Sequence, residues 1–110
     1  MDAKNVSYEF ASTLEETVPG MLSDDYKKRF IAEYNQVYIR YKKLGALVHN
    51  MLYNRDKLNF EPKCSIELLM SQLNVLRTYL CILKERACIE GIGMPDIHNI
   101  TGASCYVLEY

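Results

Sequence analysis

Two stretches of the chain carry apolar residues in unbroken alternating steps of three and four. The first set comprises Phe30, Tyr34, Val37, Tyr41, Leu44, Val48 and Met51. The second set comprises Ile66, Leu69, Leu73, Leu76, Leu80, Leu83 and Ala87. Because such steps average about 3.5 residues, each set lines one side of an α-helix. The sequence therefore predicts two long helices, over residues 23–53 and 65–90.

The connection between these helices, residues 54–64, is polar and contains Pro62, which prevents helix there. Ser23 and Ser65 are predicted to cap the two helices, and Gly91 to end the second. Long helices joined by a short connection fold back on each other. The predicted fold class is mainly α, an antiparallel long-helix hairpin with short N- and C-terminal appendages, assembled as a helical oligomer.

The hairpin is expected to occupy residues 23–92, between an N-terminal segment, residues 1–22, and a C-terminal tail, residues 93–110. Weak alternation over residues 6–10 predicts a short strand. Ser12 and Thr13, each followed three residues later by a glutamate, predict a short helix that ends at Pro19-Gly20. The apolar run at residues 105–108 predicts a second short strand.

Gly45 lies inside the first predicted helix, where a glycine is unfavourable by about 1 kcal/mol relative to alanine. Its presence indicates either the close approach of another backbone or a local kink. The sequence leaves both explanations open.

Composition limits the possible partners. A chain of 110 residues with 49 % hydrophobic and 25 % charged residues is expected to form one globular domain. Its formal net charge of −1 gives no general attraction to DNA, RNA or an anionic membrane, so an anion site must be a local cluster. No apolar run approaches the roughly 18 residues of a membrane span, and the N-terminus does not resemble a secretory signal. A cytoplasmic protein without a membrane partner is expected.

No catalytic motif is present. The sequence lacks a pair of acids, a nucleophile with a base at suitable spacing, and a glycine loop that could hold phosphates. The four cysteines, Cys64, Cys81, Cys88 and Cys105, do not have the spacing of a zinc site. We therefore expect a protein that is not an enzyme, with no catalytic residues, no metal and no cofactor.

Each predicted helix carries a second apolar stripe. The stripes comprise Ile31, Tyr38 and Leu52 on the first helix, and Leu68, Val75, Ile82 and Ile89 on the second. A two-helix hairpin covers one stripe per helix, which leaves seven large side chains whose burial represents on the order of 10 kcal/mol. Self-association through Ile31, Leu68, Val75, Ile82 and Ile89 is predicted. The alternative is that the N- and C-terminal segments fold over these stripes.

Ser71, Asn74 and Thr78 form one uncharged polar face on the second helix, with Arg77 beside it and Tyr79 nearby. Hydroxyls and amides suit the edges of nucleobases because they both donate and accept hydrogen bonds, and an arginine adds a fork for phosphate. These four residues of the face and its flank, Ser71, Asn74, Arg77 and Thr78, are candidate ligand-binding residues. The alternative is an ordinary solvent-exposed face.

Arg40 and Lys43 belong to a basic cluster on the first helix, next to Tyr38. Cations can hold phosphates while a neighbouring ring stacks on a base. Arg40, Lys43 and Tyr38 are therefore also candidate ligand-binding residues. The alternative is that the tyrosine packs in the hairpin and the cations are solvated.

Residues 23–92 resemble a family of small helical hairpins encoded by crAss-like and other gut phages. The resemblance rests on DYKKRFIAEY at residues 25–34, LNF at 58–60, LLMSQL at 68–73 and YLCILKERA at 79–87. The hairpin is also similar to that of phage anti-CBASS and anti-Thoeris sponge proteins. Those proteins form oligomers and sequester cyclic nucleotides or cyclic ADP-ribose isomers without cleaving them.

The resemblance implies a phage anti-defence protein of the host bacterial cytoplasm, a homo-oligomer whose ligand is a cyclic nucleotide immune signal. The alternative, from a different functional class, is a helical protein–protein inhibitor of a host defence protein, similar to an anti-CRISPR. The candidate ligand residues come from the helix faces described above.

Overall fold

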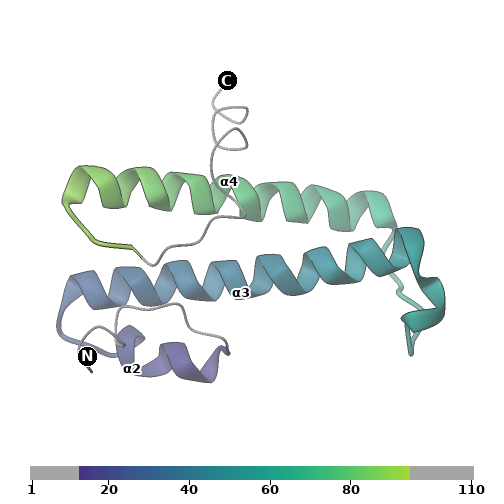
Figure 1. The fold of residues 1–110 in the computed structure, drawn as a ribbon, viewed down its shortest axis with the longest axis horizontal. Coiled ribbons are helices and arrows are strands. Elements are labelled where there is room, and N and C mark those ends of the chain that lie inside the picture. Colours follow the sequence, from purple (N-terminus) through teal and green to yellow (C-terminus); the bar gives the residue numbers. More distant parts are fainter. Residues whose placement is uncertain (1–12, 95–110) are drawn as a thin grey trace.

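The computed structural model describes residues 13–94 and is mainly helical. Its elements are η1 (Glu15–Thr17), α2 (Val18–Met21), α3 (Tyr26–Tyr53), η2 (Arg55–Lys57) and α4 (Ile66–Glu90). Figure 1 shows α3 and α4 side by side and antiparallel, with α2 against the other side of α3. The predicted strands at residues 6–10 and 105–108 lie outside the described residues, as does Ser12.

The start of α3 differs from the prediction. Asp25 caps the helix by accepting a hydrogen bond from the Lys27 amide at 2.9 Å, so the helix begins at Tyr26. Ser23, the predicted cap, accepts instead from the Asp25 amide at 3.0 Å and stabilises the turn before the helix. Several adjacent residue types were suitable caps, and spacing alone did not distinguish them.

The sequence analysis predicted that a short helix ends at Pro19-Gly20. Both residues instead lie within α2. A proline is tolerated in the first turn of a helix because its missing N–H has no partner there. Gly20 permits α2 to approach α3 closely, since an added Cβ would lie 3.1 Å from Ala32 Cβ. Close backbone approach, one of the two explanations left open for Gly45, is thus observed at Gly20.

The ends of α4 are as predicted. Ser65 accepts a hydrogen bond from the Leu68 amide at 3.1 Å, and Gly91 adopts the left-handed conformation with φ of 72°. After this turn the Ile92 amide donates to the Ala87 carbonyl at 2.9 Å, and the Ile92 side chain is buried in the core. The helix end thus directs the chain back onto the hairpin.

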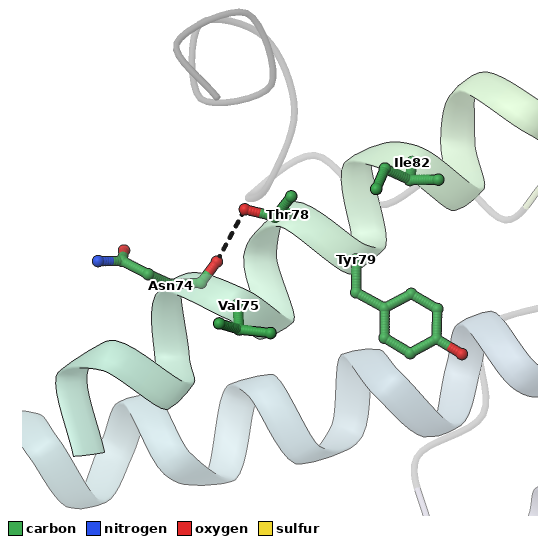
Figure 2. Close-up of a pocket in the computed structure, with 5 residues that line it drawn as sticks. All are labelled: Asn74, Val75, Thr78, Tyr79 and Ile82. Atoms are coloured by element: carbon green, nitrogen blue, oxygen red, sulfur yellow. Dashed lines mark hydrogen bonds between the residues drawn. The ribbon is translucent and has the colours of Figure 1, made fainter. Parts of the chain in front are cut away.

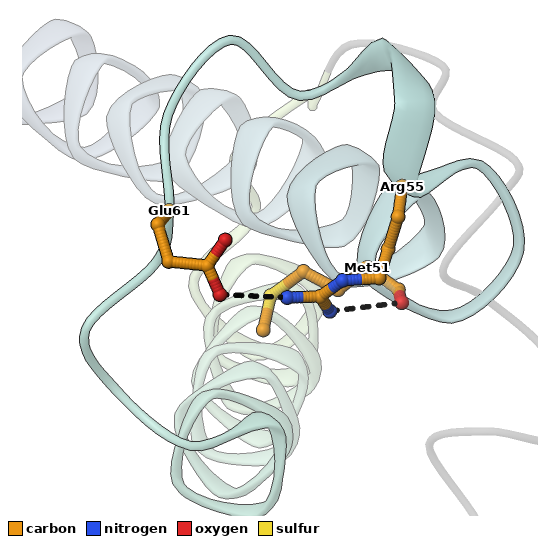
Figure 3. Close-up of polar contacts among 3 residues, drawn as sticks. All are labelled: Met51, Arg55 and Glu61. Carbon is orange, nitrogen blue, oxygen red and sulfur yellow. Dashed lines mark hydrogen bonds and ion pairs between the residues drawn. The ribbon is translucent and has the colours of Figure 1, made fainter.

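The connection between α3 and α4 is held by Arg55. Its guanidinium donates to the Met51 carbonyl at 3.3 Å and pairs with the Glu61 carboxylate at 3.2 Å (Figure 3). Both side chains of this ion pair are largely exposed, so it contributes little to stability. Its role is to order the turn that makes the helices antiparallel.

The two predicted sets of apolar residues supply most of the core cluster. Tyr34, Leu80 and Leu83 are the largest fully buried side chains, and the core cluster also includes Phe30, Val37 and Ala87. Along the first half of α4, Leu69, Leu73 and Leu76 are only half-buried. The tightest packing is therefore between the start of α3 and the end of α4.

Most of the second stripe on α3 is not available to a partner. Ile31 and Tyr38 are each 3 % exposed and belong to the core cluster of the chain. The prediction of Ile31 as an interface residue is therefore wrong, because the chain itself covers it. Leu52, at the end of the helix, remains 49 % exposed.

The second stripe on α4 is uncovered. Leu68, Val75, Ile82 and Ile89 are 59, 65, 52 and 79 % exposed, and we call these four residues the outer stripe. By length and composition α4 could cross a membrane, although the sequence contained no uninterrupted apolar run of that length. Only 22 % of the apolar stretch of α4 that passes this test is buried. A single helix of this kind is weak evidence for a membrane span.

Replacing Gly45 by alanine is expected to raise the free energy of unfolding by about 0.5–1 kcal/mol. The helix continues unbroken through Gly45, and an added Cβ would lie 3.8 Å from a Leu73 methyl, an ordinary contact. Chemical denaturation of the variant and its parent measures the difference. A destabilised variant would show that this position needs the space of glycine.

Candidate functional site

A shallow, open groove of about 360 Å³ lies on α4. Its lining comprises Asn74, Val75, Thr78, Tyr79 and Ile82 (Figure 2). The surface is almost entirely apolar, and its polar groups lie at the margin. The groove therefore brings together two predicted ligand residues, Asn74 and Thr78, and two residues of the outer stripe, Val75 and Ile82.

The polar groups of the groove make hydrogen bonds within α4 and still have donors and an acceptor for a ligand. The Thr78 hydroxyl donates to the Asn74 carbonyl at 3.0 Å, the bond drawn in Figure 2. The Asn74 side-chain oxygen accepts from the Arg77 guanidinium at 2.7 Å. Among the described residues, these bonds leave the Asn74 amide N–H groups as donors and the Thr78 oxygen as an acceptor. Such a set can recognise the edge of a base or a ribose.

Ser71 and Arg77 lie beside the groove and do not line it. The exposed Ser71 hydroxyl donates to the Glu67 carbonyl at 3.1 Å, one turn earlier on α4. The Arg77 side chain is half-buried and orients the Asn74 amide. Arg77 therefore contacts the site through Asn74.

The predicted ligand-binding residues of α3 lie in different environments. Arg40 and Lys43 are exposed, and neither lines the groove. The Tyr38 ring is buried, and the Lys42 ammonium lies 5.8 Å from its centroid. The prediction that Tyr38 stacks on a ligand is therefore wrong, because its ring packs inside the hairpin. The alternative stated for the tyrosine is the observed one.

Tyr79 is the groove residue that the sequence analysis assigned neither to the ligand nor to the oligomer interface. Its hydroxyl donates a hydrogen bond to the Glu33 carboxylate on α3. This bond raises the pKa of Tyr79, and partial burial and the negative charge of Glu33 act in the same direction against the opposing charge of Arg86. The phenol therefore stays protonated at neutral pH. The sequence carried no signal for this bond, because the two residues are far apart in the chain.

Other polar side chains near the hairpin core have structural roles. Burial raises the pKa of Tyr34, which is neutral in the core. The Arg86 guanidinium lies 4.9 Å from the centroid of the Phe30 ring and pairs with Glu90 at 3.2 Å. Across residues 13–94, no group of three or more His, Cys, Asp or Glu side chains converges on a point that could hold a metal.

The described residues form a small helical protein, a hairpin of two long helices with an open, mostly apolar groove on its outer face as the candidate binding surface. The Sequestin family model matches residues 24–89, which is more than half of the chain. The protein belongs to the Sequestin family. The family name denotes sequestration, and it fits a protein that binds and holds a small ligand.

The matched region begins just before α3 and ends within the last turn of α4. It thus contains both helices and every residue of the groove. The search of curated proteins and the search of solved structures found no match.

Proposed function

We propose that this protein is a phage anti-defence sponge, which binds a cyclic nucleotide immune signal and holds it without cleaving it. The observation that carries the proposal is the groove on α4, where an apolar surface adjoins the Asn74 amide and the Thr78 hydroxyl. The Sequestin match supports sequestration as the activity. The cyclic nucleotide and the phage origin follow from the resemblance to hairpin sponges.

The groove suits the base and ribose of a cyclic nucleotide better than its phosphates. Base and ribose faces are largely apolar and can lie on Val75 and Ile82, while the Asn74 amide donates to an edge. Phosphates need cations, and the five lining residues include none. A second subunit that supplied Arg40 and Lys43 would complete the site. Both residues are exposed on α3 and available to another copy.

The outer stripe supports self-association as part of this function. Its four exposed residues lie seven apart on α4, the spacing of a helix–helix contact. Two of them line the groove, so a subunit placed on this stripe would also enclose the ligand. We propose a homo-oligomer in the host bacterial cytoplasm that acts as neither an enzyme nor a membrane protein.

Isothermal titration calorimetry tests the proposal with three probes: cyclic di-AMP, cyclic tri-AMP and cyclic ADP-ribose. Saturable binding of at least one probe, with a stoichiometry at or below one ligand per chain, is the expected result. Absence of binding to all three would overturn the proposal as stated. Affinity for a purified host defence protein would then favour the helical protein–protein inhibitor, because the outer stripe is also suited to a protein partner.

Replacing Asn74 by alanine is expected to weaken binding of the recognised nucleotide by about 1–3 kcal/mol, since it removes a hydrogen bond from an apolar site. Calorimetry measures the change, and Asn59→Ala in the exposed connection is the matched control. If both variants bind as tightly as the parent, Asn74 is not part of the site.

A further inference from the structure

Tyr79 differs in kind from the other residues of the groove. Val75 and Ile82 offer aliphatic surface, and Asn74 and Thr78 offer polar groups at the margin. Tyr79 offers the one aromatic ring of the lining, and its side chain is 38 % exposed. Figure 2 shows the ring reaching from α4 toward α3, away from Asn74 and Thr78. It therefore forms the side of the groove that adjoins the other helix.

The orientation of this ring is held by α3. The Tyr79 hydroxyl donates to the Glu33 carboxylate, and a hydrogen bond to a charged acceptor is stronger than one between neutral groups. The ring is thereby attached at both ends, to α4 through its Cβ and to α3 through its hydroxyl. A fixed ring loses little side-chain entropy when a flat ligand group stacks on it. Base-on-ring stacking also tolerates different bases, because every base has a π-face.

The same side of α3 carries a cation. Arg40 follows Glu33 by seven residues, two helical turns, and so lies on nearly the same face of the helix. Arg40 is exposed, whereas Glu33 is half-buried and its carboxylate accepts the hydrogen bond from the Tyr79 hydroxyl. The Tyr79 ring thus adjoins α3, and Arg40 lies two turns further along that helix, outside the lining of the groove.

We propose that Tyr79 is the base-stacking wall of the ligand site and that Glu33 is its positioning residue. This inference rests on the proposed function, and it deepens it by naming which chemical group of the nucleotide the groove recognises. The base lies against the Tyr79 ring and on Val75 and Ile82. Glu33 acts only through Tyr79.

Calorimetric titration with cyclic di-AMP, cyclic tri-AMP and cyclic ADP-ribose tests the stacking wall. Tyr79→Leu removes the ring and is expected to weaken binding of the recognised probe between about fivefold and a hundredfold. Tyr79→Phe keeps the ring without its anchor, so a smaller loss is expected. Tyr53→Leu, which alters a 71 % exposed tyrosine at the far end of α3, is the matched control. Circular dichroism of each variant monitors the helical fold.

A double-mutant cycle tests the positioning role. Glu33→Ala is expected to weaken binding about as much as Tyr79→Phe, and Glu33→Gln to restore most of the affinity because its amide oxygen still accepts the hydrogen bond. In the Tyr79→Leu background, Glu33→Ala should have no further effect. A full additional loss in that background would overturn the positioning role.

The outcomes separate this inference from the proposed function. Parent protein that binds a probe, loses affinity on Asn74→Ala and keeps it on Tyr79→Leu would refute the stacking wall alone. Parent protein that binds none of the three probes would refute both.

Discussion

Replacing Leu80 by alanine is expected to lower the free energy of unfolding by about 2–5 kcal/mol. Leu80 is fully buried in the core between α3 and α4, in the same cluster as Tyr34 and Leu83. The shortened side chain loses its transfer free energy and leaves a cavity that rigid neighbours cannot fill. For a domain of this size, such a loss lowers the melting temperature by roughly 10 °C or more.

Thermal unfolding followed by circular dichroism measures this effect. Parent and variant are compared at the same protein concentration, because self-association would make the melting temperature depend on concentration. Leu22→Ala is the control, since its side chain is 77 % exposed and its removal leaves no cavity. Equal melting temperatures for Leu80→Ala and the parent would contradict the position of the core.

Replacing Val75 by glutamate is expected to break the proposed oligomer into 12.8 kDa chains that remain helical. Val75 is 65 % exposed in the single chain, so a glutamate there is solvated and harmless to the hairpin. In a subunit contact the same carboxylate would lose its water without gaining a partner, which is strongly unfavourable. Because the groove includes Val75, nucleotide binding should be lost with the assembly.

Light scattering at micromolar concentration measures the mass, with Leu22→Glu as a control that places the same charge just after α2, at a residue that does not line the groove. The parent and this control are expected at a multiple of the chain mass. A parent that already has the mass of one chain would refute the oligomer, and an unchanged mass for Val75→Glu would remove the outer stripe from the contact.

The sequence predicted the helices well because their signals are local. The alternating steps identified the residues that form the core, including Tyr34, Leu80 and Leu83. The cap at Ser65 and the stop at Gly91 depend on neighbouring backbone atoms, and both were correct. The antiparallel arrangement followed from the short connection, which needed no knowledge of distant contacts.

The errors that affect the candidate site concern what covers each helix. Ile31 and Tyr38 have the spacing of an unpaired stripe, yet the chain buries them. The periodicity of the sequence shows that one face of a helix is apolar. It does not show which other surface covers that face. The same limit concealed the bond between Tyr79 and Glu33, which depends on how two distant helix positions meet. On α4 the sequence correctly predicted that the hairpin leaves the outer stripe exposed. The groove lies on this stripe.

Recovery of intact nucleotide is the measurement that most directly tests reversible sequestration. The protein is incubated with cyclic di-AMP, cyclic tri-AMP or cyclic ADP-ribose, the free nucleotide is quantified after ultrafiltration, and the protein fraction is then heated. A sponge depletes at least one of these nucleotides from solution and releases it with unchanged mass when the hairpin melts. Recovery of a cleaved product would contradict sequestration, and a free nucleotide concentration equal to that of a protein-free control for all three would contradict binding itself.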